Sequence, residues 1–185
     1  MSDNLIFEFI ERIGYVIRTE WRKALLEYDL QPVHLDVLRY LAACNRYSDT
    51  PQGVAEYLEI TKGTISQSIK QLESKGFVEK QADASDRRMV HLHLTEKAQA
   101  LLDKLTPPPG FDAAMRNFSG QEEAALLGNL RDILAQWQIA RKRQRFGVCH
   151  TCRYYQPGGA GTGQCGLTGE GLSAEDSQKI CREFT

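Results

Sequence analysis

The fold is decided by residues 61–94, which read TKGTISQSIKQLESKGFVEKQADASDRRMVHLHL. Thr61 has a side chain that accepts a hydrogen bond from a free amide of a first helical turn, so we expect a helix to begin there. Gly76 suits the left-handed conformation that ends many helices. Apolar residues three or four positions apart form one face, namely Ile65, Ile69 and Leu72. The pattern predicts an amphipathic helix over residues 61–75.

Two strands joined by a polar tip are predicted after this helix. Phe77 and Val78 begin the first strand, and residues 89–94 alternate between apolar and polar side chains as a second strand does. The tip between them, residues 81–88, ends in two arginines. A helix with a polar outer face followed by an arginine-tipped hairpin is typical of a recognition helix and its wing.

The outer face of this helix carries the groups that a DNA-reading surface needs. A helix enters the major groove with its N-terminal residues at the base edges, and lysines beside them meet phosphates. An arginine at a hairpin tip can reach the narrow minor groove. The predicted DNA-contacting residues are Thr61, Lys62, Thr64, Ser66, Gln67, Lys70, Arg87 and Arg88. The alternative is an ordinary helix and hairpin whose polar face is solvated.

Helices are predicted on both sides of the 61–94 stretch. Apolar residues recur at helical spacing over 4–28, 32–45, 51–58, 95–105, 111–118 and 120–143. The 51–58 helix and the helix after Thr61 form a helix-turn-helix unit, whereas the three prolines at 107–109 interrupt the chain. Helices 4–28 and 120–143 have surplus apolar surface, which predicts a helical dimerisation region; a well-buried core helix is the alternative for 4–28. The predicted fold class is mainly α with a small β-wing, that is, α+β.

The charge and composition restrict the function classes. The net charge of the 185 residues is −1, but residues 61–94 carry 6 basic and 4 acidic residues, and residues 141–185 carry 7 and 4. A near-neutral net charge is therefore compatible with DNA binding, because DNA responds to the local electrostatic field of the contacting surface. The sequence has no apolar run of membrane-spanning length and no signal-peptide pattern, so we expect a cytoplasmic protein without a membrane partner. No phosphate loop, catalytic triad spacing or carboxylate pair points to an enzyme.

Four of the five cysteines lie in the last 37 residues, at Cys149, Cys152, Cys165 and Cys181. In a reducing cytoplasm, such a cluster favours a metal site over disulfides. The spacing has one close pair followed by two single cysteines, whereas zinc ribbons present two close pairs. The glycine-rich stretch 156–163 is expected to form no regular element, so a metal would have to order this part of the chain. We divide the chain into residues 1–145, with the winged helix, and an irregular cysteine-rich module, residues 146–185.

Residues 63–102, GTISQSIKQLESKGFVEKQADASDRRMVHLHLTEKAQALL, resemble the winged helix-turn-helix of the MarR family of transcription regulators. The matching features are the Leu-Glu-x-Lys-Gly helix end, the Asp-Arg-Arg wing and the Leu-Thr-Glu-Lys opening of the next helix. The resemblance implies a homodimer that binds a near-palindromic DNA operator, usually as a repressor, relieved by a small ligand or by thiol oxidation. It also implies that Arg88 is the minor-groove arginine and that Asp86 orients it. The break at 106–110 departs from the family's longer fifth helix.

The cysteine spacing, with tyrosines after the first pair, is similar to that of small high-potential-type iron–sulfur modules. This similarity implies a [4Fe–4S] cluster on the four cysteines; zinc, or a disulfide or metal-free tail, is the alternative. The first function hypothesis is a DNA-binding regulator tuned by this centre through the adjoining helix 120–143. The second is a redox or electron-transfer protein whose winged helix binds a protein partner.

Overall fold

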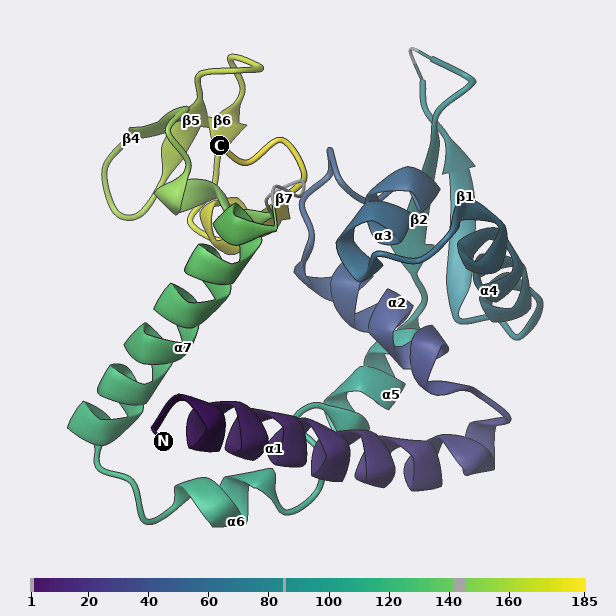
Figure 1. Ribbon diagram of the computed structural model, residues 1–185. Coiled ribbons are helices and arrows are strands. Elements are labelled where there is room, and N and C mark those ends of the chain that lie inside the picture. The colour runs from purple at the N-terminus through teal and green to yellow at the C-terminus, as the bar shows by residue number, and fades with distance from the viewer. Residues whose placement is uncertain (1, 85, 142–145) are drawn as a thin grey trace.

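The computed structural model describes residues 2–84, 86–141 and 146–185 (Figure 1). The α-helices are α1 (Ser2–Leu25), α2 (Pro32–Ala43), α3 (Pro51–Leu58), α4 (Lys62–Ser74), α5 (Glu96–Leu105), α6 (Phe111–Met115) and α7 (Gly120–Ala140). The strands are β1 (Val78–Ala82), β2 (Val90–Leu94), β3 (Gly147–Val148), β4 (Tyr155–Pro157), β5 (Gly163–Cys165), β6 (Gly171–Leu172) and β7 (Ile180–Cys181). Single 3₁₀ turns follow α1 at Leu26–Tyr28, β3 at Cys149–Thr151 and β6 at Asp176–Gln178.

Local capping explains where the predicted helices begin. Thr50, Thr61, Thr95 and Ser119 each accept a hydrogen bond from an amide of the first turn that follows. At α7 the cap is reciprocal, because the Glu122 side chain returns to the Ser119 amide at 2.8 Å. Gly76 has a φ of +72° after α4, as the left-handed position requires. These helices match the sequence prediction, although α6 is shorter and the predicted end of the last helix at 143 lies outside the described residues.

The winged-helix body is built from α2, α3, α4 and α5 with the β1–β2 hairpin. The hairpin is antiparallel, with Val78 opposite Leu94 and Ala82 opposite Val90. Its core contains aliphatic and aromatic side chains from every one of these elements, including Leu35, Leu38, Val54, Ile69, Leu72, Phe77, Leu92 and Leu101. This core fixes α4 against α3 and the wing, so the outer face of α4 is held in one orientation.

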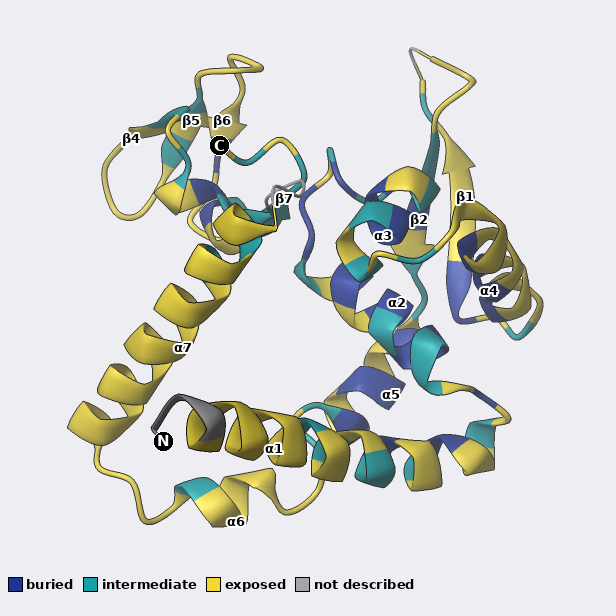
Figure 2. Ribbon diagram, viewed as in Figure 1, coloured by how far each residue is buried: buried dark blue, intermediate teal, exposed yellow. Residues whose placement is uncertain are grey.

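The helices α1, α6 and α7 lie outside this body, and most of their length is exposed in the single chain (Figure 2). Phe9 of α1 is 67% exposed and Trp137 of α7 is 53% exposed. With α6, these helices line an apolar cleft of about 1130 Å³. Contiguous apolar surface exposed on a single chain commonly marks an interface with another molecule. No helix in the described part of the chain is long and apolar enough to cross a membrane.

The expectation that residues 156–163 form no element is wrong. β4 pairs with β5 from Tyr155–Cys165 to Pro157–Gly163, and β6 extends this small sheet. The turn between β4 and β5 contains two positive φ angles, +53° at Ala160 and +77° at Gly161, of which only the second has the freedom of a glycine. The module still has little core, since its buried side chains among the described residues are Cys149, Leu172 and Ser177.

Candidate DNA-reading surface and cysteine cavity

The outer face of α4 is exposed along its whole length. Its buried side carries Ile65, Ile69 and Leu72, as the spacing predicts. The predicted contact residues Thr61, Lys62, Thr64, Ser66, Gln67 and Lys70 are all exposed on the other side. Thr61 also caps α4, because its hydroxyl oxygen accepts a hydrogen bond from the Thr64 backbone amide at 3.3 Å. The fold therefore presents short polar and basic groups around the N-terminal half of α4, where a major-groove helix makes its base contacts.

The wing places its two arginines together at an exposed tip, far from the core. Arg87 and Arg88 are both exposed. Asp86 accepts the backbone amide of Arg88 at 3.0 Å, so its contact is with the chain that carries the arginine. The family-derived role of Asp86 in orienting the Arg88 side chain stays a prediction. Both arginines remain available to phosphates or to the minor groove beside the helix.

A histidine bridge beside the tip loop of the wing was not foreseen from the sequence. His91 Nδ1 lies 2.5 Å from Asp49 Oδ1, and its Nε2 lies 3.1 Å from Asp83 Oδ2. The hydrogen bond and charge of Asp49, then those of Asp83, raise the pKa of His91 above its usual value, although partial burial opposes this. Asp49 precedes α3, so the bridge ties the wing to the helix-turn-helix. The alternating sequence of residues 89–94 placed His91 on a strand. It gave no signal that Asp49 and Asp83, which lie elsewhere in the chain, would be its partners.

The four predicted metal ligands come together in the structure. Cys149, Cys152, Cys165 and Cys181 all line one small cavity of about 20 Å³. Its other walls are mostly aromatic and aliphatic side chains with two polar ones: Asn45, Tyr47, Tyr154, Tyr155, Leu167, Leu172 and Glu183. Within the described residues, no three His, Cys, Asp or Glu side chains are grouped closely enough to hold a single metal ion. The thiols therefore share one cavity without forming a tight mononuclear site.

Two of these thiols interact directly. A hydrogen bond from Cys149 lowers the pKa of Cys181 to about 6, and the same contact with burial raises the pKa of Cys149. The Asn45 amide also donates to the Cys149 sulfur at 3.4 Å. One thiol of the pair is thus prepared to be a thiolate, the form that binds metals. His150 does not line this cavity; it is exposed, and its Nδ1 lies 3.1 Å from the Ser177 carbonyl oxygen.

Cys44 lies outside this cavity and behaves as a buried apolar residue. It is 6% exposed at the end of α2, and burial raises its pKa to about 12. A lone cysteine of this kind is either a small buried hydrophobe or a redox thiol. The burial and the raised pKa both favour the first, since a reactive cysteine needs access and thiolate character.

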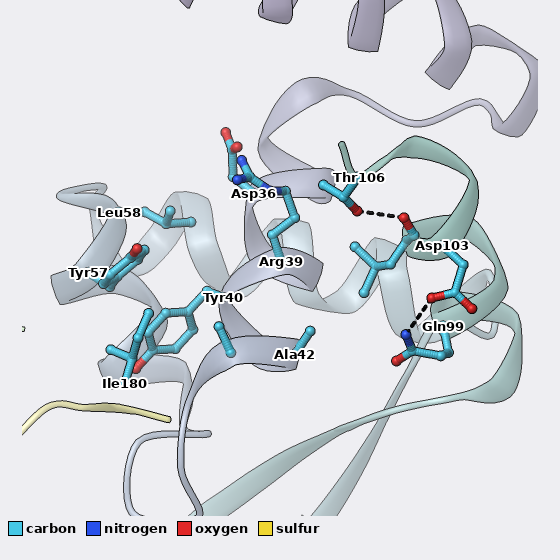
Figure 3. Close-up of a pocket in the computed structure, with 12 residues that line it drawn as sticks. Asp36, Arg39, Tyr40, Ala42, Tyr57, Leu58, Gln99, Asp103, Thr106 and Ile180 are labelled. Carbon is cyan, nitrogen blue, oxygen red and sulfur yellow. Dashed lines mark hydrogen bonds between the residues drawn. The ribbon is translucent and has the colours of Figure 1, made fainter. Parts of the chain in front are cut away.

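A second cavity lies between α2 and α5 and was also missed (Figure 3). It holds about 500 Å³ and has Asp36, Arg39, Tyr57 and Gln99 among its walls, with Ile180 of β7 at one side. Burial raises the pKa values of Asp36 and Tyr57. A cavity with a few convergent polar groups is the usual setting for a small ligand. Its residues come from distant parts of the chain, so no local pattern could indicate it.

Comparison with known proteins shows which proteins this chain is similar to. Residues 28–89 match the family model of the MarR family. The HTH-type transcriptional repressor NicR of Pseudomonas putida is 25% identical over 139 residues, which cover 71% of this chain and 88% of NicR. The structure of Streptococcus pneumoniae FabT in complex with DNA has a TM-score of 0.60 at 24% identity and covers 74% of this chain and 98% of FabT. A MarR regulator from Methanosarcina mazei Go1 has a TM-score of 0.61 at 21% identity and covers 74% and 99%.

These findings show that the fold is that of winged-helix proteins and that residues 28–89 are similar to transcription regulators. They support the MarR family in particular, whose members are transcription regulators and not enzymes. The predicted winged α+β fold is confirmed at this level. The division of the chain at residue 145 and the individual DNA-contacting residues stay predictions.

Proposed function

We propose that the protein is a homodimeric repressor that binds a near-palindromic DNA operator. The observation that carries this proposal is the exposed polar and basic face of α4 beside an exposed arginine-tipped wing. The similar proteins support DNA binding and repression, since NicR is a transcriptional repressor and both FabT and Staphylococcus aureus MepR have structures with DNA. The apolar surface of α1 and α7 gives each chain a face for a second copy. A twofold dimer presents two copies of α4 and therefore selects a near-palindrome.

The test begins with an operator selected from a random duplex library by the wild-type protein. Gln67→Ala should relax the sequence preference at one position, since a good base contact contributes about 1–3 kcal/mol. Lys70→Ala should weaken binding to all duplexes alike and reduce the salt dependence, because it removes one phosphate contact. Arg88→Ala should weaken binding most where the minor groove is narrow.

The matched control is Lys104→Ala, which removes a lysine that pairs with Glu27 at 3.3 Å, away from α4 and the wing. Its affinity should equal that of the wild type. If Gln67→Ala and Arg88→Ala leave operator affinity unchanged, the assignment of this surface is wrong. If no duplex binds with salt-dependent affinity, the second hypothesis, a redox protein that uses its winged helix for a protein partner, replaces the first.

We further propose that Cys149, Cys152, Cys165 and Cys181 hold a [4Fe–4S] cluster that tunes DNA binding. The residues fit the group in three respects: four thiols share one cavity, its walls are largely apolar, and one thiol has a lowered pKa. The cysteine spacing, one close pair followed by two single cysteines, differs from the two close pairs of zinc ribbons. The sparse core of the module also fits a metal that supplies ordering energy. When bound, such a cluster supplies one-electron redox chemistry and sensitivity to oxidants.

Metal analysis of anaerobically purified protein tests this second part. Iron and acid-labile sulfide should each be about four per chain, with a brown colour and a broad visible absorption. Zinc at about one per chain would replace the cofactor assignment, and no metal would remove it. Cys152→Ser should lose the cluster, whereas Cys44→Ser should keep it because Cys44 does not line the cavity.

A further inference from the structure

The cysteine module rests directly on the loop between α2 and α3, residues 44–50 (Figure 1). The Asn45 amide donates to the Ile180 carbonyl of β7 at 2.9 Å, and the Arg182 amide donates to the Ser48 hydroxyl at 2.9 Å. The Arg182 guanidinium forms an ion pair with Glu56 of α3, with Nη2 3.1 Å from Oε1. The end of the module is therefore attached both to the loop and to the first helix of the helix-turn-helix.

Asn45 belongs to the cysteine cavity and to the loop at once. Its side chain is nearly inaccessible, at 3% exposure. The amide nitrogen donates to the Cys149 sulfur at 3.4 Å, while the amide oxygen accepts the Ser48 hydroxyl at 2.7 Å and the Tyr47 backbone amide at 3.2 Å. Both Asn45 and Tyr47 line the cavity. The wall of the cysteine site is thus completed by residues of the winged-helix body.

The other side of the loop is attached to the DNA-reading elements. The Asp49 carbonyl accepts the Leu92 amide of β2 at 2.8 Å, and the Asp49 side chain holds His91 of the wing. Thr50 caps α3 by accepting the Gly53 amide at 3.1 Å. α3 leads into α4 through Glu59 and Ile60. The short loop backbone from Asn45 to Thr50 therefore joins a residue bonded to a cysteine sulfur with residues bonded to the wing and to the start of α3.

We infer that the α2–α3 loop, through Asn45 and the Arg182–Glu56 pair, carries the state of the four-cysteine cavity to the recognition helix and the wing. This inference rests on the proposed function and names its route, which differs from the adjoining helix 120–143 considered from the sequence. A metal centre in the cavity would hold the thiolates of Cys149 and Cys181 in fixed positions, and these residues would in turn hold Asn45 and Arg182 in place. The loop, α3 and the wing are then held in one arrangement before DNA arrives, so the loaded protein binds DNA more tightly. Without a metal centre, the hydrogen bonds of Asn45 and the Arg182–Glu56 ion pair form but are not held by fixed cysteines.

The test compares the full chain in two states, reconstituted anaerobically with iron and sulfide or stripped with a chelator. The ratio of the two operator dissociation constants measures the coupling, and about fivefold or more is expected for the wild type. Glu56→Gln and Asn45→Ala should each bring the ratio to within about twofold of one. Glu59→Gln is the matched control, because it breaks the ion pair between α3 and Arg141 at the end of α7 and leaves the loop contacts intact. It should retain the wild-type ratio.

A second measurement uses no DNA. Amide hydrogen exchange should show stronger protection of residues 44–50 and of Leu92 in the loaded wild type, and an equal rate in both states of Glu56→Gln. Glu56→Gln keeps the inference testable if Asn45→Ala fails to fold, since Glu56 is a partly exposed side chain. Equal affinities of loaded and stripped wild type would overturn the proposed tuning itself. A wild-type ratio that survives Glu56→Gln but is lost in Glu59→Gln would overturn only the inferred route and assign it to α7.

Discussion

The histidine bridge formed by His91, Asp49 and Asp83 gives the sharpest prediction about stability. The side chains of His91, Asp49 and Asp83 are 18%, 13% and 25% exposed, so solvent screens their interactions only in part. A hydrogen bond to a charged group contributes about 1.5–3 kcal/mol. His91→Phe removes two of these and leaves both carboxylates facing a ring, so it should lower the free energy of unfolding by about 3 kcal/mol at pH 6. His91→Gln keeps one donor and should cost about half as much.

The pH dependence of this effect has a definite sign. The carboxylates raise the pKa of His91 in the folded state above its usual value of about 6.5. A raised folded pKa means that the contribution is fully present below the unfolded pKa and is lost as the pH rises through the folded value. The difference between wild type and His91→Phe should therefore be largest near pH 6 and shrink towards pH 9. His34, whose pKa burial lowers, is present in both proteins and cancels in the difference.

The assay is urea unfolding of the full chain at several pH values, followed by circular dichroism at one fixed protein concentration, because dimerisation shifts apparent stability. His93→Phe is the matched control on the same strand, since His93 is exposed. It should change stability by no more than about 0.5 kcal/mol. A His91→Phe cost equal to that of His93→Phe, or one that does not vary between pH 6 and pH 9, would refute the bridge.

Three further results are expected. Gly53→Ala should destabilise the fold by about 1–3 kcal/mol in urea unfolding, because its added Cβ would lie 2.3 Å from the Ser48 carbonyl oxygen. Gly63→Ala, whose added Cβ would have no atom within 4 Å apart from its chain neighbours and its own helix backbone, should be neutral or stabilising. An equal cost at both sites would contradict the close approach at Gly53. Cys44 should resist a maleimide reagent in the native protein and react once the protein is unfolded, since burial raises its pKa to about 12. Mass spectrometry would detect the labelling, and rapid labelling of native Cys44 would exclude a purely structural thiol. Light scattering at micromolar concentration should give twice the chain mass, and Trp137→Glu should reduce it by placing a charge on the apolar face of α7; a monomeric wild type would contradict the dimer.

The sequence alone determined the local structure of the winged helix. Capping residues and three-to-four-residue apolar spacing act between neighbours in the chain, so they predicted α3 at its observed bounds and α4 with its cap at Thr61. The same periodicity predicted which side of α4 is exposed, because one buried face leaves the other to solvent. Residue types and spacing also singled out the four cysteines, which do line one cavity.

Only the tertiary structure decided how these parts meet. Asn45 contacts a sulfur 104 positions away, Arg182 pairs with a glutamate 126 positions away, and His91 joins an aspartate 42 positions away. The β4–β5 hairpin was missed for a related reason, since its glycine-rich turn has no apolar periodicity and its strands are ordered by pairing with each other. Local patterns act over a few residues, whereas such contacts exist only after the core has brought distant segments together. The position of the cysteine module on the α2–α3 loop is therefore a property of the fold and of no single stretch of the sequence.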